Sequence, residues 1–204
     1  MKQKGFTLIE MVVVLAVVAI LAAILVPTIA KNIQDANISR AQNETQVIAG
    51  AIASFYKDLG RWPTSKGASG NPDELTLLTS ENGNYSSTSS SWNKNSAPST
   101  TDYMEYHLVQ NDPGYLNASY VHTSGSNDYP GTGRWRWRGP YIPEIAADPF
   151  GIHYSCNVQY LYDTSSGNYA VYVLSAGPNK QWDTTFGQPL PGTIGGDDIG
   201  TPVK

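Results

Sequence analysis

An unbroken apolar run near the N-terminus constrains the fold of this chain more than any other feature. Residues 11–26 carry no polar side chain, and the mostly apolar residues 6–9 and 28–30 extend the run at both ends. A helix needs about 20 such residues to cross a bilayer, so the sequence predicts a membrane-spanning helix over residues 6–30. Because two lysines precede the run, we expect them to stay in the cytoplasm and the rest of the chain to be exported.

An ordinary signal peptide or signal anchor is the simplest alternative for this segment. However, the sequence PTIAKNIQDAN after Val26 contains no A-x-A-like cleavage site. Glu10 also lies in the segment, where a carboxylate near the bilayer centre costs about 2.5–3.5 kcal/mol. A carboxylate in this place indicates a specific partner rather than a simple anchor.

The helical pattern continues past the apolar run as an amphipathic segment over residues 31–59. One stripe of this helix recurs at spacings of three and four residues, and it consists of Ala41, Thr45, Ile48, Ile52, Phe55 and Leu59. Gly60 and the following string Arg61-Trp62-Pro63-Thr64 predict that the helix ends there. We expect the stripe to pack on the domain that follows.

The string Gly5-Phe6-Thr7-Leu8-Ile9-Glu10 resembles the leader motif of type IV pilins, pseudopilins and related filament proteins. The resemblance implies that residues 1–5 are a leader, that a prepilin peptidase cuts between Gly5 and Phe6, and that the new amine of Phe6 is methylated. It also implies an α+β fold, in which a long N-terminal helix packs on a small antiparallel β-sheet with long loops. The string GRWPT after the helix is similar to a turn in the major pseudopilins of type II secretion.

Glu10 and Pro27 both fall at positions that the pattern of this family also has. A carboxylate buried among apolar helices must be paired or protonated, and in a filament the amine of Phe6 on a neighbouring subunit is a suitable partner. Such a pair sets the axial register, because a slip leaves both charges unpaired. Pro27 bends or weakens a helix, and it either allows a local unwinding that extends the helix or makes a kink without a role.

The exported domain is expected to have two parts. Residues 60–132 form a variable, loop-rich segment that is either a tolerated surface insertion or a contact for a partner. Residues 133–204 hold the β-sheet and a C-terminal loop. Cys156 is the only cysteine, so no intramolecular disulfide can form, and we expect it to be a small buried side chain.

Local composition predicts further elements within these parts. Low apolar content predicts a long surface loop over residues 86–101, and alternation predicts a strand over residues 103–109. Strands over residues 153–162 and 169–175 are expected to form an antiparallel hairpin.

Two motifs near the C-terminus indicate a calcium site. The string Ser175-Ala176-Gly177-Pro178-Asn179 and the later string Gly195-Gly196-Asp197-Asp198-Ile199 offer carboxylate, hydroxyl and amide oxygens, which are the ligands that Ca²⁺ prefers. They resemble the calcium-binding loop of major pseudopilins, although Asn179 stands where that family has aspartate. The resemblance implies that Asp197 and Asp198 are the main ligands, with Ser175, Asn179 and the carbonyl of Leu174 beside them. The alternative is a polar turn in which both aspartates cap backbone N–H groups.

The string Gly133-Arg134-Trp135-Arg136-Trp137-Arg138 alternates cations with aromatic side chains. On a strand this alternation puts the arginines on one face and the tryptophans on the other, which predicts an edge strand with tryptophans packed inward. The alternative is a surface that binds single-stranded nucleic acid by charge and stacking. Because the formal net charge of −4 shows no basic excess, the edge strand is preferred. The strings Gly139-Pro140-Tyr141 and Asp148-Pro149-Phe150-Gly151 resemble pseudopilin turns and are expected to be architectural.

The sequence favours a structural protein over an enzyme, because its three histidines are scattered and it has no nucleophile elbow. The leading hypothesis is a type II secretion pseudopilin, which leaves an inner-membrane assembly platform to join a periplasmic filament, alone or with minor pilins. One alternative is an extracellular type IV pilin for adhesion, motility or DNA uptake. Another is a membrane-anchored binding module that does not polymerise.

Overall fold

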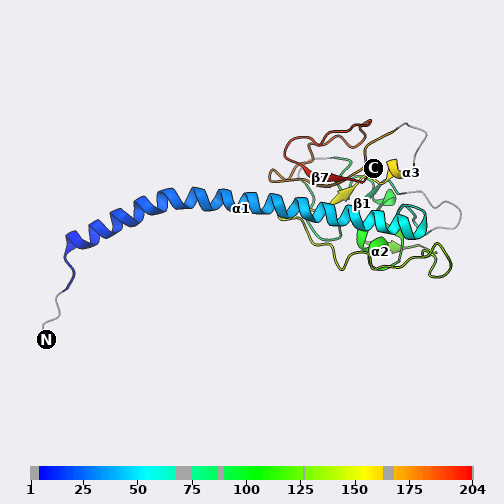
Figure 1. The fold of residues 1–204 in the computed structure, drawn as a ribbon, viewed down its shortest axis with the longest axis horizontal. Helices are drawn as coiled ribbons and strands as arrows, with labels where there is room; N and C mark the ends of the chain where they lie inside the picture. Colours follow the sequence, from blue (N-terminus) through cyan, green and yellow to red (C-terminus); the bar gives the residue numbers. More distant parts are fainter. Residues whose placement is uncertain (1–4, 68–74, 87–89, 126, 163–167, 204) are drawn as a thin grey trace. The chain divides into compact units, whose positions relative to one another are not determined.

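The computed structural model describes residues 5–67, 75–86, 90–125, 127–162 and 168–203. The chain divides into two compact units, Met1–Asn37 and Ile38–Lys204. Helix α1, Leu8–Leu59, begins in the first unit and ends in the second (Figure 1).

The first unit consists of the N-terminal part of α1. Each of its large apolar side chains from Leu8 to Ile29 is at least half exposed, so none is covered by other parts of the unit. Within the described residues, α1 is the one helix that is long and apolar enough to cross a membrane. This agrees with the predicted membrane-spanning segment over residues 6–30.

The second unit is built on the C-terminal half of α1, where the predicted stripe is confirmed. All six stripe residues are buried, and Ile52 and Phe55 are fully buried. The ring of Phe55 packs edge-on against Tyr129 with ring centroids 4.8 Å apart. The helix ends at Leu59 because Gly60 takes a φ of +68°, a left-handed conformation that glycine adopts readily.

A five-stranded sheet packs against this half of α1 (Figure 1). Its strands lie in the order β2-β1-β5-β6-β7, and their bounds are β1 Leu77–Thr79, β2 Thr101–Tyr103, β5 Ser155–Cys156, β6 Tyr172–Ser175 and β7 Ile199–Pro202. Neighbouring strands pair antiparallel except β1 and β2, which are parallel. The predicted α+β architecture and the antiparallel pairing of β5 with β6 are therefore confirmed. A separate hairpin joins β3, Gly114–Leu116, to β4, His122–Ser124.

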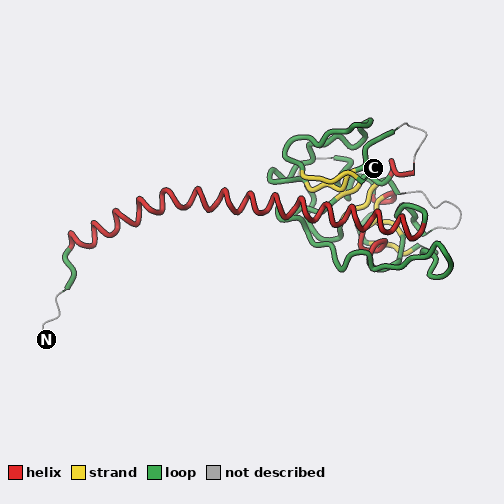
Figure 2. The backbone as a smooth tube through the Cα atoms, viewed as in Figure 1, coloured by secondary structure: helices red, strands yellow, loops and turns green. Residues whose placement is uncertain are grey.

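Alternate side chains of the sheet enter two different cores. Leu78, Cys156 and Val173 join the cluster around α1, and Cys156 is fully buried as predicted. Side chains of the other set pack against aromatic residues from the loops, in a cluster that contains Leu77, Tyr172, Leu174, Trp92, Trp182 and Phe186. Loops make up most of this unit around the strands (Figure 2).

Two of the predicted strands are wrong in part. In residues 103–109, β2 ends at Tyr103 and a short helix α2, Met104–Leu108, takes the rest. In residues 153–162, β5 is followed by helix α3, Gln159–Tyr162. The reason is that buried side chains there recur at helical spacing, such as Met104 with Leu108 and Val158 with Leu161.

Residues 87–89 of the predicted surface loop over residues 86–101 lie outside the described residues, and the described part of the loop is partly buried. Trp92 is fully buried, and its Nε1 donates to the carbonyl of Thr184 at 2.7 Å. Lys94 is 6% exposed, and its Nζ donates to two backbone carbonyls at 3.1 and 3.3 Å. A 3₁₀ helix η1, Pro98–Thr100, then leads into β2. The prediction failed because Trp92 is buried by residues far away in the sequence.

Residues 133–138 form no strand, so the predicted edge strand is wrong. Trp137 packs against the core, and its Nε1 donates to the carbonyl of His107 at 3.0 Å. Trp135, in contrast, is 52% exposed. The chain turns at Gly133, which takes a φ of +92°, and the two tryptophans consequently differ in burial instead of sharing an inward face.

Candidate functional site

The predicted cleavage point lies in an exposed, non-helical position. Because α1 begins at Leu8, the bond between Gly5 and Phe6 precedes the helix. Phe6 is 85% exposed, and nothing beyond the adjacent residues lies within 4 Å of the position of a Cβ on Gly5. A peptidase can therefore reach this bond without unwinding α1.

Thr7 and Glu10 form a capping box at the start of α1. The backbone N–H and the Oγ1 of Thr7 both donate to Oε2 of Glu10 at 2.8 Å, and the backbone N–H of Glu10 donates to Oγ1 of Thr7 at 3.4 Å. These bonds satisfy N–H groups that a helix start leaves free. Sequence reasoning missed this local role of Glu10, although T-x-x-E before an apolar run is its signature.

Helix α1 runs through Pro27 without interruption. Pro27 has no N–H to donate to the carbonyl of Ala23, so one bond of the helical ladder is missing. Beside this place, Oγ1 of Thr28 donates to the carbonyl of Ile24 at 3.1 Å. A local unwinding at Pro27 stays a prediction.

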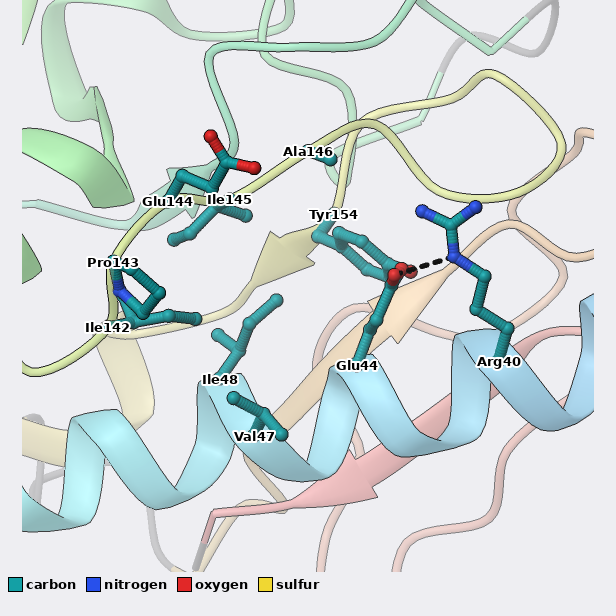
Figure 3. Close-up of a pocket in the computed structure, with 10 residues that line it drawn as sticks. All are labelled: Arg40, Glu44, Val47, Ile48, Ile142, Pro143, Glu144, Ile145, Ala146 and Tyr154. Carbon is teal, nitrogen blue, oxygen red and sulfur yellow. Dashed lines mark hydrogen bonds and ion pairs between the residues drawn. The ribbon is translucent and has the colours of Figure 1, made fainter.

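A groove lies between α1 and residues 142–146 of the second unit, with a volume of about 250 Å³ (Figure 3). Oε1 of Glu44 accepts from Nε of Arg40 at 2.7 Å, and its Oε2 accepts from the hydroxyl of Tyr154 at 2.5 Å. Val47, which also lines the groove, is 56% exposed. The groove therefore combines an exposed apolar side chain with an ion pair that its own residues form.

The two C-terminal motifs lie against each other. Gly177 takes a φ of +65°, and a Cβ on it would lie 2.1 Å from the carbonyl oxygen of Asp197. This close approach requires glycine. The backbone N–H of Asn179 donates to Oδ2 of Asp197 at 2.9 Å, so the structure brings these two predicted ligands together.

Two carboxylate oxygens in this loop are left without a partner. Oδ2 of Asp198 accepts from the backbone N–H groups of Asp183 and Thr184 at 3.0 and 2.7 Å. Oδ1 of Asp197 and Oδ1 of Asp198 are buried and accept no hydrogen bond within the described parts of the chain. Burial raises the pKa of Asp198 to about 6. Sequence reasoning missed Asp183, whose Oδ2 accepts from Nδ2 of Asn179 at 2.8 Å.

The other predicted ligands have different contacts. Oγ of Ser175 donates to Oδ2 of the buried Asp148 at 2.6 Å, and Leu174 pairs with Gly200 of β7. Oδ1 of Asn179 accepts a backbone N–H at 2.6 Å. Across the described residues, no three His, Cys, Asp or Glu side chains are placed to hold a metal ion. The unpaired oxygens of the two aspartates fit a cation, but a complete Ca²⁺ shell would also need carbonyl or water ligands.

Comparisons with known proteins found a family model at the N-terminal site and several relatives. Residues 1–26 match the family model of the prokaryotic N-terminal methylation motif. Fimbrial protein EcpC of Eikenella corrodens is 41% identical over 68 residues, which are 33% of this chain and 44% of the relative. The type II secretion system core protein G of Klebsiella pneumoniae is 31% identical over 65 residues, 32% of this chain and 46% of the relative.

A third relative, the type IV major fimbrial protein FimA of Dichelobacter nodosus, is 36% identical over 88 residues, 39% of this chain and 55% of the relative. The chain thus spans about half of the length of the curated relatives that it matches. No solved structure matches the chain. The motif and these relatives make the chain similar, over part of its length, to the superfamily of type IV pilins and pseudopilins. This is a class of structural proteins rather than of enzymes.

Proposed function

We propose that this chain is a structural subunit of a type IV pilus-like filament, cut between Gly5 and Phe6 by a prepilin peptidase. The observation that carries the proposal is the apolar surface of α1, on which each large side chain from Leu8 to Ile29 is at least half exposed. Such a surface needs a bilayer or other apolar helices to cover it. The bilayer covers it before assembly, and neighbouring copies of α1 cover it in the filament, alone or mixed with minor pilins.

The charge of Glu10 gives this assembly a defined register. Within the described residues, the capping bonds from Thr7 use only Oε2 of Glu10, so Oε1 is available to a cation. Cleavage creates an amine on Phe6, and the amine of a neighbouring subunit is the cation that assembly brings near. A slip along the filament axis would leave both charges unpaired in an apolar surrounding, which is strongly unfavourable.

Two matched substitutions test this role. Glu10→Gln keeps an oxygen that accepts the capping bonds but removes the charge, and it should abolish or strongly reduce the filaments recovered from cells. Thr7→Val removes the capping hydroxyl at a cost of about 0.5–2 kcal/mol but keeps the charge, so it should still assemble. If Glu10→Gln assembles as well as the wild type, the register role is wrong.

The finer proposal is a pseudopilin of a type II secretion system. It is supported by the resemblance of Gly139-Pro140-Tyr141, Asp148-Pro149-Phe150-Gly151 and the C-terminal aspartate pair to pseudopilin motifs. The alternative, an extracellular type IV pilin for adhesion, motility or DNA uptake, is supported equally by the fimbrial relatives. Deleting the gene and comparing secreted proteins with surface filaments separates the two. Loss of secretion without loss of surface filaments favours the pseudopilin, and the reverse favours the pilin.

We also infer that the C-terminal loop binds Ca²⁺ through Asp197 and Asp198. The inference is supported by their two buried, unpaired Oδ1 atoms, because a hard cation satisfies such oxygens. A bound ion would tie the loop before β7 to the turn after β6, in a chain whose single cysteine forms no intramolecular disulfide. The adjacent Asp183 is a further candidate for the coordination shell.

Thermal unfolding of the full chain in a non-ionic detergent tests the calcium inference. Ca²⁺ at about 100 times its dissociation constant adds about 2.7 kcal/mol to the free energy of unfolding. This corresponds to an increase of about 5–11 °C in the unfolding midpoint for a chain of this size. A chelator should remove this increase and excess Ca²⁺ should restore it. Asp198→Asn should abolish the shift of the unfolding midpoint by Ca²⁺. Asp128 is an exposed acid in another loop, so Asp128→Asn should keep the shift. No shift in the wild type would remove the inference.

A further inference from the structure

One exposed surface is used by neither the filament nor the calcium proposal. It lies where α1 ends, at a hollow that Tyr56, Lys57 and Trp135 line. It also includes Arg134 and Arg136, the exposed residues on either side of Trp135 in the sequence. We refer to these five side chains as the aromatic–cation surface. Tyr56 is 42% exposed and Trp135 is 52% exposed, although large aromatic side chains contribute most to stability when buried.

The two aromatic rings border a shallow hollow of about 440 Å³, which Leu59 and Gly60 also line. Trp135 lies so close to Gly60 that a Cβ there would be 3.1 Å from the indole ring. Tyr56 stacks on Trp62 with ring centroids 4.0 Å apart and an interplanar angle of 22°. Both rings have neighbours within the chain and still remain partly in solvent, so their exposed parts offer aromatic surface to a planar ligand.

The charges around the hollow are predominantly positive. The guanidinium of Arg134 lies 5.2 Å from the centroid of the adjacent indole ring. The nearby Arg138 approaches Asp58, with Nε and Oδ1 3.9 Å apart. In the described parts of the chain, Lys57, Arg134 and Arg136 enter no ion pair. Although the whole chain has a net charge of −4, these local cations beside exposed rings favour an anionic ligand that carries aromatic groups.

We propose that the aromatic–cation surface binds single-stranded nucleic acid. Bases stack on Trp135 and Tyr56, and backbone phosphates contact Lys57, Arg134 and Arg136. Unpaired bases present π-faces that stack on aromatic side chains with little regard to sequence, whereas a duplex keeps those faces covered. An acidic polysaccharide offers sugar rings in place of planar bases, and competition with dextran sulfate distinguishes the two ligands. The proposal is independent of whether the chain forms filaments.

The charges and the rings predict two separable contributions to binding. Single-stranded binding changes with salt by a log–log slope of about −0.7 per phosphate contact, so three cations predict a slope of about −2. Affinity should then fall about 20-fold when the salt concentration rises fourfold. Removing one stacking ring should weaken binding about 5- to 150-fold at any salt concentration.

The test uses the chain from Phe6 onward in non-ionic detergent and a fluorescently labelled oligothymidylate. Fluorescence anisotropy should show binding at low salt, with quenching of tryptophan emission and the predicted salt slope. A duplex of the same length and dextran sulfate serve as competitors and should displace the oligonucleotide only weakly. Absence of binding at low salt overturns the proposal. Displacement by dextran sulfate as efficient as by unlabelled oligothymidylate also overturns it, in favour of a surface that recognises charge alone.

Substitutions locate the binding. Trp135→Ala should weaken binding about 5- to 150-fold, while Trp135→Phe, which keeps an aromatic face, should retain most of it. Arg136→Gln should make the salt slope shallower by about 0.7. Lys180→Gln removes the same charge from an exposed residue outside the surface and should leave the slope unchanged. Wild-type affinity in Trp135→Ala, or an equal loss in Lys180→Gln and Arg136→Gln, would show that the surface is not the site.

Discussion

Replacing His122 by asparagine should destabilise the second unit most at mildly acidic pH and less as the pH rises. Nδ1 of His122 lies 2.7 Å from Oδ1 of the fully buried Asp102, and its Nε2 lies 3.4 Å from Oδ2 of Asp112. The other carboxylate oxygen of Asp102 contacts Nε2 of His107 at 3.1 Å. The ring of His122 stacks on Tyr106 with centroids 3.5 Å apart. One buried carboxylate thus connects β4 to the segment of β2 and α2.

The charge state of His122 determines how this stability varies with pH. Burial alone would lower the pKa of His122, but the hydrogen bond and charge of Asp102, together with Asp112, raise it overall. Stability from a histidine with a raised pKa is fully present below the unfolded pKa of about 6.5 and is lost as the pH rises through the folded pKa. A hydrogen bond to a charged group contributes about 1.5–3 kcal/mol. At about 2–4 °C per kcal/mol, His122→Asn should lower the unfolding midpoint by about 3–12 °C near pH 6.

Thermal unfolding followed by circular dichroism, from mildly acidic to alkaline pH, measures this difference. His153→Asn is the matched control, because burial, with a smaller effect of the charge of Lys94, lowers the pKa of His153 to about 3. His153 therefore stays neutral in the folded chain, whereas the unfolded chain binds a proton on it below about pH 6.5. Its replacement should consequently become less destabilising as the pH falls below about 6.5, which is the opposite trend to that of His122→Asn. An effect of His122→Asn that is constant with pH, or that grows as the pH rises, would refute the reasoning.

Two stability predictions concern the core and the C-terminal loop. Phe55→Ala should lower the free energy of unfolding by about 3–5 kcal/mol because the ring is fully buried. Val47 lies on the exposed side of α1, so Val47→Ala should change the free energy measured by urea unfolding by less than about 0.5 kcal/mol. Equal losses in the two variants would contradict this placement of the helix. Ser175→Ala should cost about 1–3 kcal/mol by removing the hydroxyl that donates to Asp148. This decrease in the free energy of unfolding should be the same with and without Ca²⁺. A decrease seen only in the presence of Ca²⁺ would instead indicate that Ser175 is a ligand.

The long helix could be predicted from the sequence because its signals are local. The stripe that includes Ile48, Ile52 and Phe55 has helical spacing over many turns, and Gly60 supplies the left-handed residue that ends it. The cleavage motif is equally local, since it consists of consecutive residues. The capping bond between Thr7 and Glu10 could also have been predicted from the T-x-x-E pattern.

The rest depends on contacts between residues that are distant in the sequence. Trp92 lies in a polar stretch, and its burial follows from its contacts with Trp182 and the carbonyl of Thr184. Asp183 lies between the two predicted calcium motifs and comes next to Asp198 only when the loop folds. Helix α2 is too short for its period to be distinguished from that of a strand. Exposure of Trp135 was not predictable either, because the turn at Gly133 breaks the alternation.

Mass spectrometry of the N-terminal peptide from purified filaments tests the central claim most directly. The account predicts that the subunit in assembled filaments begins at Phe6 and carries a methyl group on its amine. An intact bond between Gly5 and Phe6, in protein found only as unassembled membrane-bound chains, would contradict it. That result would favour a membrane-anchored module that does not polymerise.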